Sequence, residues 1–230
     1  MGSRGAGSGI TESNQKPLGG GGGGNGKEPI TVHMYDVAPK DLDAALGDKG
    51  RAMNIDNALK GANPFYAGGD QGDYSNNCQR CVVAYEARRR GYDVFAQPTY
   101  SGDTLPAGDN WKGAFVNPKT DHVGASTPQK TQQNLENKMK SYGNGSRAIV
   151  SIPGHVFNCE NVNGKIRYVD AQTNTVYSSK NVFSRIGRKS NTISIMRTDN
   201  LNFSDNAKKS ITPVSDVMKR TGRTENRHKR

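Results

Sequence analysis

Apolar residues gather in short groups in the middle of the chain, and the two ends are almost entirely polar. The clearest group predicts a helix over residues 77–90. Asn77 is a good N-cap residue at its start, and Gly91 follows three arginines at its end as the C′ glycine. Residues 41–45 and 55–59 each predict a shorter helix.

Short strands are predicted between and after these helices. Apolar runs and alternations place them at residues 30–34, 94–96, 148–150 and 193–196. A long loop is expected from residue 98 to about residue 129, and it contains the single tryptophan, Trp111. It leads into a polar helix over residues 129–142, which Gly143 ends. No internal repeat is visible along the chain.

The Asn163-Gly164 pair predicts a β-hairpin. Strand-like residues lie on both sides of it, and Asn-Gly is the preferred loop of a type I′ turn. A two-residue loop places Phe157 opposite Asp170 and His155 opposite Gln172. Asp170 is then the diagonal neighbour of His155, roughly 7–8 Å away between backbones and within side-chain reach.

Composition divides the 230 residues into four parts. Residues 1–27 are rich in Gly, Ser and charge, and predict a flexible linker or tag, because they bury too little apolar surface to offset their ordering entropy. Residues 28–62 are a lead-in segment, and residues 63–206 are expected to form one catalytic domain. Residues 207–230 are expected to be a basic tail.

The formal net charge of +11 favours nucleic acid, anionic membranes or acidic proteins as partners. Much of the excess lies in the arginines at positions 88–90 and in the tail. Arginines at a helix C-terminus are stabilised by the helix dipole and need no ligand. The tail would supply a weak, sequence-independent nucleic-acid contact. No stretch approaches the ~18 apolar residues of a membrane-spanning helix, and the first residues carry no apolar signal-peptide core.

Three residues form a candidate nucleophilic site. Cys78 falls in the first turn of the predicted helix, where unpaired N–H groups and the helix dipole stabilise a thiolate. His155 is a base on the first hairpin strand, and Asp170 lies beside it to orient the imidazole. This Cys-His-Asp combination is typical of an enzyme that attacks carbonyl carbon through sulfur.

The other cysteines leave alternatives open. Cys81 lies one turn into the helix and suits a small apolar core position, or it pairs with Cys78 as half of a zinc site. Neither Cys159 nor the scattered histidines supply paired zinc ligands, so no metal and no cofactor are predicted. Three cysteines do not suggest a disulfide framework. His122 is expected in a loop beside Asp121, with a surface role.

Two motifs resemble a known family. The run from Asn77 to Val94, which reads NCQRCVVAYEARRRGYDV, and the later Gly154-His155-Val156-Phe157-Asn158 and Val169-Asp170-Ala171-Gln172-Thr173 resemble the papain-fold toxin domains of bacterial polymorphic toxins, the Tox-PL or toxin glutamine deamidase family. Similar domains also occur at the ends of phage minor head proteins. The resemblance covers about residues 63–203. It implies an α+β papain-like cysteine hydrolase fold, with the catalytic helix packed on an antiparallel sheet.

The resemblance also implies residue roles. Cys78 maps to the nucleophile, His155 to the base and Asp170 to the acid, while Cys81 stays an alternative nucleophile because papain-type proteases use the second cysteine of a Cys-x-x-Cys. Asn77 and Gln172 are candidates for the oxyanion site or the substrate pocket.

The expected activity is deamidation of a glutamine in a protein substrate of a target cell, with an immunity protein as a second partner. A delivered effector or a virion-associated protein fits this reading. A cysteine protease or acyl transferase would use the same triad. A non-catalytic phage or virion module with a nucleic-acid-binding tail is the alternative of another class.

Overall fold

The computed structural model describes residues 39–68, 74–99, 110–177 and 192–215. The predicted linker at residues 1–27 and the predicted strand at residues 30–34 lie outside these ranges, as does most of the predicted tail. Six strands form one sheet in the order β2-β7-β3-β4-β5-β6, and β1 and β8 form a second, two-stranded sheet. Every pairing in both sheets is antiparallel.

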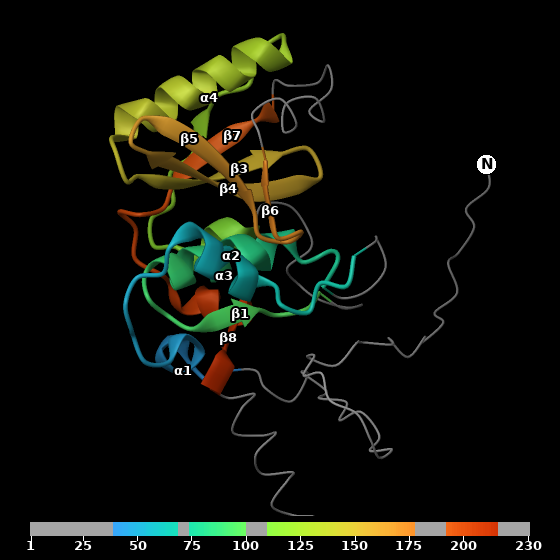
Figure 1. The fold of residues 1–230 in the computed structure, drawn as a ribbon, viewed down its shortest axis with the longest axis vertical. Coiled ribbons are helices and arrows are strands. Elements are labelled where there is room, and N and C mark those ends of the chain that lie inside the picture. Colours follow the sequence, from blue (N-terminus) through green and yellow to red (C-terminus); the bar gives the residue numbers. More distant parts are fainter. Residues whose placement is uncertain (1–38, 69–73, 100–109, 178–191, 216–230) are drawn as a thin grey trace, which may run out of the picture.

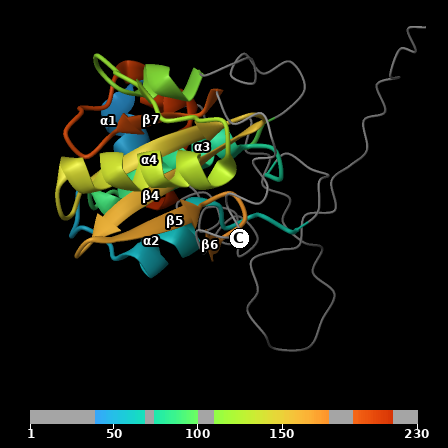
Figure 2. The same cartoon turned by 90° about the horizontal axis from the view of Figure 1, so that it is seen from above.

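The elements are arranged in layers (Figure 1). One face of the six-stranded sheet is covered by α4, the other by α3 with α2 beside it, and the β1-β8 pair and α1 lie beyond α3 (Figures 1 and 2). The helices are α1 (Leu42–Leu46), α2 (Ile55–Ala62), α3 (Cys78–Arg89) and α4 (Pro128–Tyr142), with 3-10 turns η2 (Asn110–Ala114) and η4 (Asp205–Lys209). The strands are β1 (Val94–Ala96), β2 (Asp121–His122), β3 (Arg147–Ile152), β4 (His155–Val162), β5 (Lys165–Asp170), β6 (Thr175–Tyr177), β7 (Ser194–Arg197) and β8 (Ile211–Pro213).

Two apolar clusters hold these layers together, one on each face of the sheet. The larger joins α1, α2 and α3 to the sheet through residues such as Leu59, Val83 and Ile149. The smaller fills the space under α4 with Leu135, Met139 and their neighbours from the strands. The α+β arrangement expected from the sequence, a helix packed on an antiparallel sheet, is therefore the fold of the chain.

The hairpin predicted at Asn163-Gly164 is confirmed. Val162 pairs with Lys165, and Asn158 pairs with Val169, which is the predicted register. Both loop residues have positive φ, 52° at Asn163 and 80° at Gly164, as a type I′ turn requires. The predicted helices at residues 41–45, 55–59, 77–90 and 129–142 also correspond to α1, α2, α3 and α4.

The packed body extends past the expected boundaries of the catalytic domain at residues 63 and 206. Ala58, Leu59 and Ala62 of the lead-in segment are buried in the larger cluster, as are Ala207 and Ile211 of the expected tail. Ile211 is the first residue of β8. Strand β8 pairs with β1, which is the element that follows α3 in the chain. The first part of the expected tail thus belongs to the packed body, because residues 211–213 complete the small sheet.

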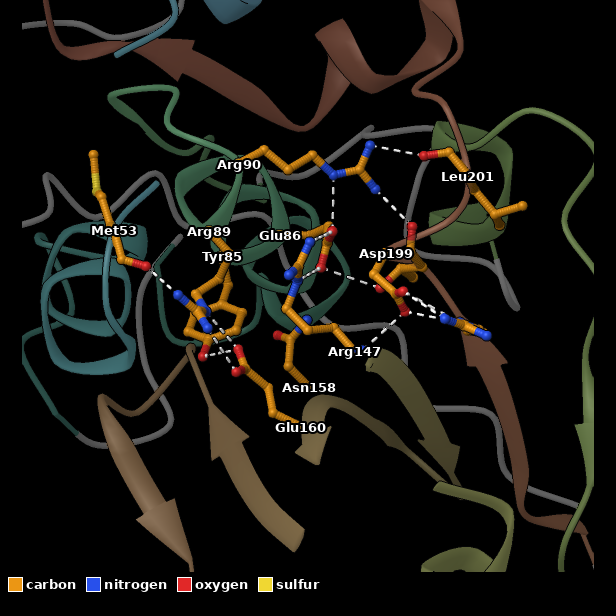
Figure 3. Close-up of polar contacts among 12 residues, drawn as sticks. Met53, Tyr85, Glu86, Arg89, Arg90, Arg147, Asn158, Glu160, Asp199 and Leu201 are labelled. Atoms are coloured by element: carbon orange, nitrogen blue, oxygen red, sulfur yellow. Dashed lines mark hydrogen bonds and ion pairs between the residues drawn. The ribbon is translucent and has the colours of Figure 1, made fainter. Parts of the chain in front are cut away.

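Arg89 and Arg90, at the C-terminal end of α3, do more than complement its dipole, as Figure 3 shows. Arg89 forms two hydrogen bonds to Glu160 of β4, which also accepts from the hydroxyl of Tyr85. Arg90 binds Glu86, a fully buried carboxylate that also accepts from Arg147 of β3. These paired charges fasten α3 to the sheet.

Candidate functional site

The three predicted catalytic residues lie at element ends that meet at one end of the sheet. His155 is the first residue of β4, Asp170 is the last of β5, and Cys78 is the first of α3. Because β4 and β5 are antiparallel, the start of one lies beside the end of the other. The packing of α3 on the sheet brings its N-terminus to the same place.

A tight turn places His155. Pro153 and Gly154 join β3 to β4, with Ile152 paired to His155 across them. Gly154 has φ 79°, a conformation that costs other residues energy because their Cβ crowds the backbone. Pro followed by Gly is the signature of a type II turn. The Gly-His motif therefore reflects the turn that starts the strand carrying the imidazole.

The imidazole and the carboxylate form a direct pair. His155 Nε2 lies 3.0 Å from Asp170 Oδ2, which matches the diagonal pairing predicted from the hairpin register. The Asp170 side chain is 3% exposed and that of His155 is 26% exposed. Asp170 also accepts from the backbone N–H of Gln172 at 3.0 Å and from the hydroxyl of Tyr177 at 3.2 Å. The acid is buried and held, while the imidazole remains open to solvent on one side.

The electrostatics of the pair favour its charged form. Burial alone would lower the pKa of His155, but hydrogen bonds and charge from Asp170 and Cys78 outweigh it and raise the pKa of His155 to about 10. Burial would likewise raise the pKa of Asp170, yet the net effect of His155 and the nearby donors lowers the pKa of Asp170 below 3.8. Cys78 lies close enough to His155 to contribute to this rise in the pKa of His155. Because Nε2 faces Asp170, Nδ1 is the ring nitrogen available to a thiol.

Cys81, the alternative nucleophile, lies in a different environment. It is 1% exposed and belongs to the larger apolar cluster. Its thiol donates to Asn77 Oδ1 at 3.1 Å. Burial, followed by the charges of Cys78 and Asp170, raises the pKa of the Cys81 thiol well above 9.0. Such a sulfur stays protonated and out of reach of substrate, whereas Cys78 is half-buried.

Asn77 and Gln172 have different contacts from those the sequence suggested. Asn77 makes no side-chain cap to α3, and its amide is instead buried and bonded to Asn63 and to the carbonyl of Gln97. The Gln172 side chain donates to the carbonyl of Ser75 at 2.6 Å. Both amide side chains therefore have hydrogen-bond partners within the protein.

Asn63 was not among the candidate site residues predicted from the sequence. It is fully buried and bonds to both Asn77 and Gln172. A buried amide beside a proline has no distinctive sequence pattern, so no local signal could have found it.

The described residues contain no group of three or more His, Cys, Asp or Glu side chains arranged to hold a metal ion. His122 forms part of the two-residue strand β2 and is exposed, at a surface position like that expected for it. Within the same described ranges, no helix has the length and apolar character needed to cross a membrane.

Comparison with known proteins identifies the domain that carries these residues. No curated protein and no solved structure matches the chain. A family model described as papain fold toxin 1, glutamine deamidase, matches residues 76–175, which begin just before Cys78 and end just after Asp170. Over residues 76–175 the chain is therefore similar to the papain-fold toxin family of glutamine deamidases, a family of amide-acting enzymes, and its α+β fold is papain-like.

Proposed function

We propose that this protein deamidates a glutamine side chain of a target protein, with Cys78 as nucleophile, His155 as general acid and base, and Asp170 as the group that orients His155. The observation that carries this proposal is the position of His155, which bonds to the buried carboxylate of Asp170 through Nε2 and lies near Cys78 at the start of α3. The raised pKa of His155 favours a protonated imidazole at neutral pH, and a cation beside a cysteine favours its reaction as a nucleophile.

In the first half of the reaction the Cys78 sulfur attacks the carboxamide carbon and the carbonyl oxygen becomes an oxyanion. The imidazolium of His155 then gives its proton to the departing nitrogen, so that ammonia leaves and a thioester remains. In the second half a water molecule loses a proton to His155 and attacks the thioester. The C–S bond breaks, the substrate leaves as glutamate, and the thiolate-imidazolium pair is restored.

The start of α3 supplies the groups for the oxyanion. The backbone N–H groups of Arg80 and Cys81 donate to the carbonyl of Asn77, and the Asn77 side chain does not cap the helix. The first N–H groups of an α-helix have no partner within it. We assign the oxyanion to the N–H groups of Cys78 and Gln79, rather than to the Asn77 amide, because that amide is already fully bonded.

Alkylation with iodoacetamide tests the nucleophile without knowledge of the target. The reaction is followed in a pH series from about 5 to 9. We expect Cys78 to react rapidly even at pH values well below the usual thiol pKa of about 8.5. Cys81 and Cys159 should react only after unfolding, because both are buried. His155→Ala should slow the alkylation of Cys78 to the rate of an ordinary thiol. Equal, slow reaction of all three cysteines would contradict the proposal and favour a non-catalytic module.

The reaction itself is tested by exposing a cell lysate to the wild type or to Cys78→Ala and comparing the peptides by mass spectrometry. A glutamine converted to glutamate only by the wild type supports deamidation. New chain ends produced only by the wild type would instead make the protein a protease, and isopeptide cross-links would make it an acyl transferase.

A further inference from the structure

Asn63, at the C-cap of α2, has a buried amide that makes four hydrogen bonds near the site. It is 0% exposed. Its Nδ2 donates to the carbonyl of Tyr74 at 3.0 Å, to the carbonyl of Gln172 at 2.9 Å and to Asn77 Oδ1 at 3.3 Å. Its Oδ1 accepts from Asn77 Nδ2 at 3.1 Å. An amide has two N–H hydrogens, so three acceptors share them.

These partners connect Asn63 to both halves of the proposed triad. On one side, Asn77 directly precedes Cys78, and the two amides of Asn63 and Asn77 bind each other reciprocally. On the other side, the backbone of Gln172 accepts from Asn63 and donates to Asp170, which holds His155. A continuous series of hydrogen bonds therefore runs from the start of α3 through Asn63 to the imidazole.

A second buried asparagine, Asn161, lies away from the site. A comparison of Asn63 with Asn161 separates a general loss of stability from a loss of positioning at the site. Asn161 of β4 is 3% exposed, donates to the carbonyls of Met139 and Gly143, and accepts from the N–H of Gly164. It lies six residues along β4 from His155, roughly 20 Å at the usual rise of a strand. Asn161 is matched to Asn63 in burial and bonding but touches neither α3 nor the turn after β5.

We propose that Asn63 is a positioning residue, which fixes the first turn of α3 against the turn at residues 170–172 and so keeps the Cys78 sulfur in contact with His155. The proposal rests on the proposed function of Cys78 and His155. It adds to the catalytic unit a residue from α2, outside the segment 76–175 that the family model matches. No part of its role requires contact with substrate.

The test is the pH profile of Cys78 alkylation by iodoacetamide in the full chain, measured for wild type, Asn63→Ala and Asn161→Ala. The temperature is set well below the unfolding transition of each protein. We expect Asn63→Ala to slow the alkylation of Cys78 about tenfold near pH 6. Asn161→Ala should lower the melting temperature but leave the alkylation profile of wild type unchanged.

The outcomes separate the two proposals. If wild-type Cys78 is activated and Asn63→Ala keeps the same profile, the positioning role is wrong and the proposed function stands. If wild-type Cys78 itself titrates as an ordinary thiol, the proposed function fails and Asn63 has no pair to position. If Asn63→Ala does not fold, Asn63→Ser, which keeps one hydrogen-bond donor, should show a smaller shift in the same direction. Failure of both variants to fold would assign Asn63 to the core and overturn the inference.

Discussion

Asp170 is held by two donors besides His155. The backbone N–H of Gln172 and the hydroxyl of Tyr177 both donate to its carboxylate. The N–H of the residue two positions on is a typical partner of an aspartate in a turn. A carboxylate bonded in this way cannot rotate, so it fixes which nitrogen of His155 faces the acid and which faces the sulfur.

Removing the charge of Asp170 should lower the stability of the protein by an amount that depends on pH. The pKa of His155 rises from 6.5 to about 10 on folding, so its contribution is complete below pH 6.5 and is lost as the pH rises towards 10. The pKa of Asp170 falls below 3.8 on folding, so its contribution is present above pH 3.8 and is lost as the pH falls further. The melting temperature of Asp170→Asn should therefore lie furthest below that of wild type between about pH 4 and 6.5.

Thermal melts of both proteins from acid to alkaline pH measure this difference. Asp93→Asn is the matched control, because Asp93 also binds a cation, Arg88, but its side chain is 61% exposed. Its effect should be small and should not vary with pH between 6.5 and 10. A difference between wild type and Asp170→Asn that stays constant over that range would contradict the assigned pKa of His155.

Gly154 is the second residue whose change should be informative. Gly154→Ala meets no atom within 4 Å of its new Cβ, so its cost comes only from the backbone at φ 79°. A residue other than glycine in this region costs roughly 1–2 kcal/mol. We expect a loss of about that size in urea unfolding, together with slower alkylation of Cys78, because the turn that starts β4 would shift His155. Unchanged stability would mean that the turn relaxes to another conformation.

At the scale of elements, α3 is fastened to the sheet by charge as well as by apolar contact. Glu86 is fully buried and binds Arg90, Arg147 and the hydroxyl of Thr198, which come from α3, β3 and the segment after β7. The amphipathic pattern of the helix is correspondingly weak, since nearly every residue from Arg80 to Arg88 is buried. The position of Cys78 therefore depends on ion pairs at the opposite end of its helix.

Glu86→Ala should destabilise the protein strongly. Breaking a buried ion pair by removing one partner costs ~3–5 kcal/mol, because the remaining charge is left buried without compensation. Arg90 and Arg147 are each only 17% exposed and would both lose their carboxylate. Urea unfolding measures the loss, and Asp93→Asn, which removes a carboxylate that is 61% exposed, should cost less. Similar losses for the two variants would show that water solvates the arginines of α3 adequately.

The same elements show what could be predicted from the sequence. The helix at residues 77–90 and the hairpin at Asn163-Gly164 carry local signals, and the hairpin register alone brings Asp170 beside His155. The partners of Asn63 lie up to 109 residues away, and those of Arg89 lie 71 residues away. Such contacts form only after the layers pack, so neither capping rules nor charge patterns indicate them. For this reason Asn77 was expected to cap α3 but binds Asn63 instead.

At the scale of the whole molecule, the segment 76–175 holds the proposed triad but not a complete core. Strand β7 lies between β2 and β3 in the sheet, and its Ile195 and Met196 are fully buried. Ala58 and Leu59 of α2 and Ile211 of β8 fill the other side of α3. Each buried Ile, Leu or Met contributes ~1.5–3 kcal/mol, which is large against the few kcal/mol of net stability.

A fragment of residues 76–175 should therefore fail to fold. We expect it to unfold without a cooperative transition and to aggregate, because the loss of β7 exposes the edge of β3. A fragment of residues 39–215, which keeps the described core, should melt close to the temperature of the full chain. Calorimetry of both fragments checks this, and a sharp transition in the shorter one would show that the triad domain is independent of its flanks.

The pairing of β8 with β1 also has a consequence for the timing of protein synthesis. A ribosome that has made residues 76–175 has already made Cys78, His155 and Asp170. The strand that completes the central sheet, β7, and the partner of β1, β8, emerge only later. Contacts between residues so distant in sequence form slowly and late. A nascent chain would thus carry all three residues of the proposed triad before its fold is complete, and the proposed activity would begin only after synthesis has passed residue 213.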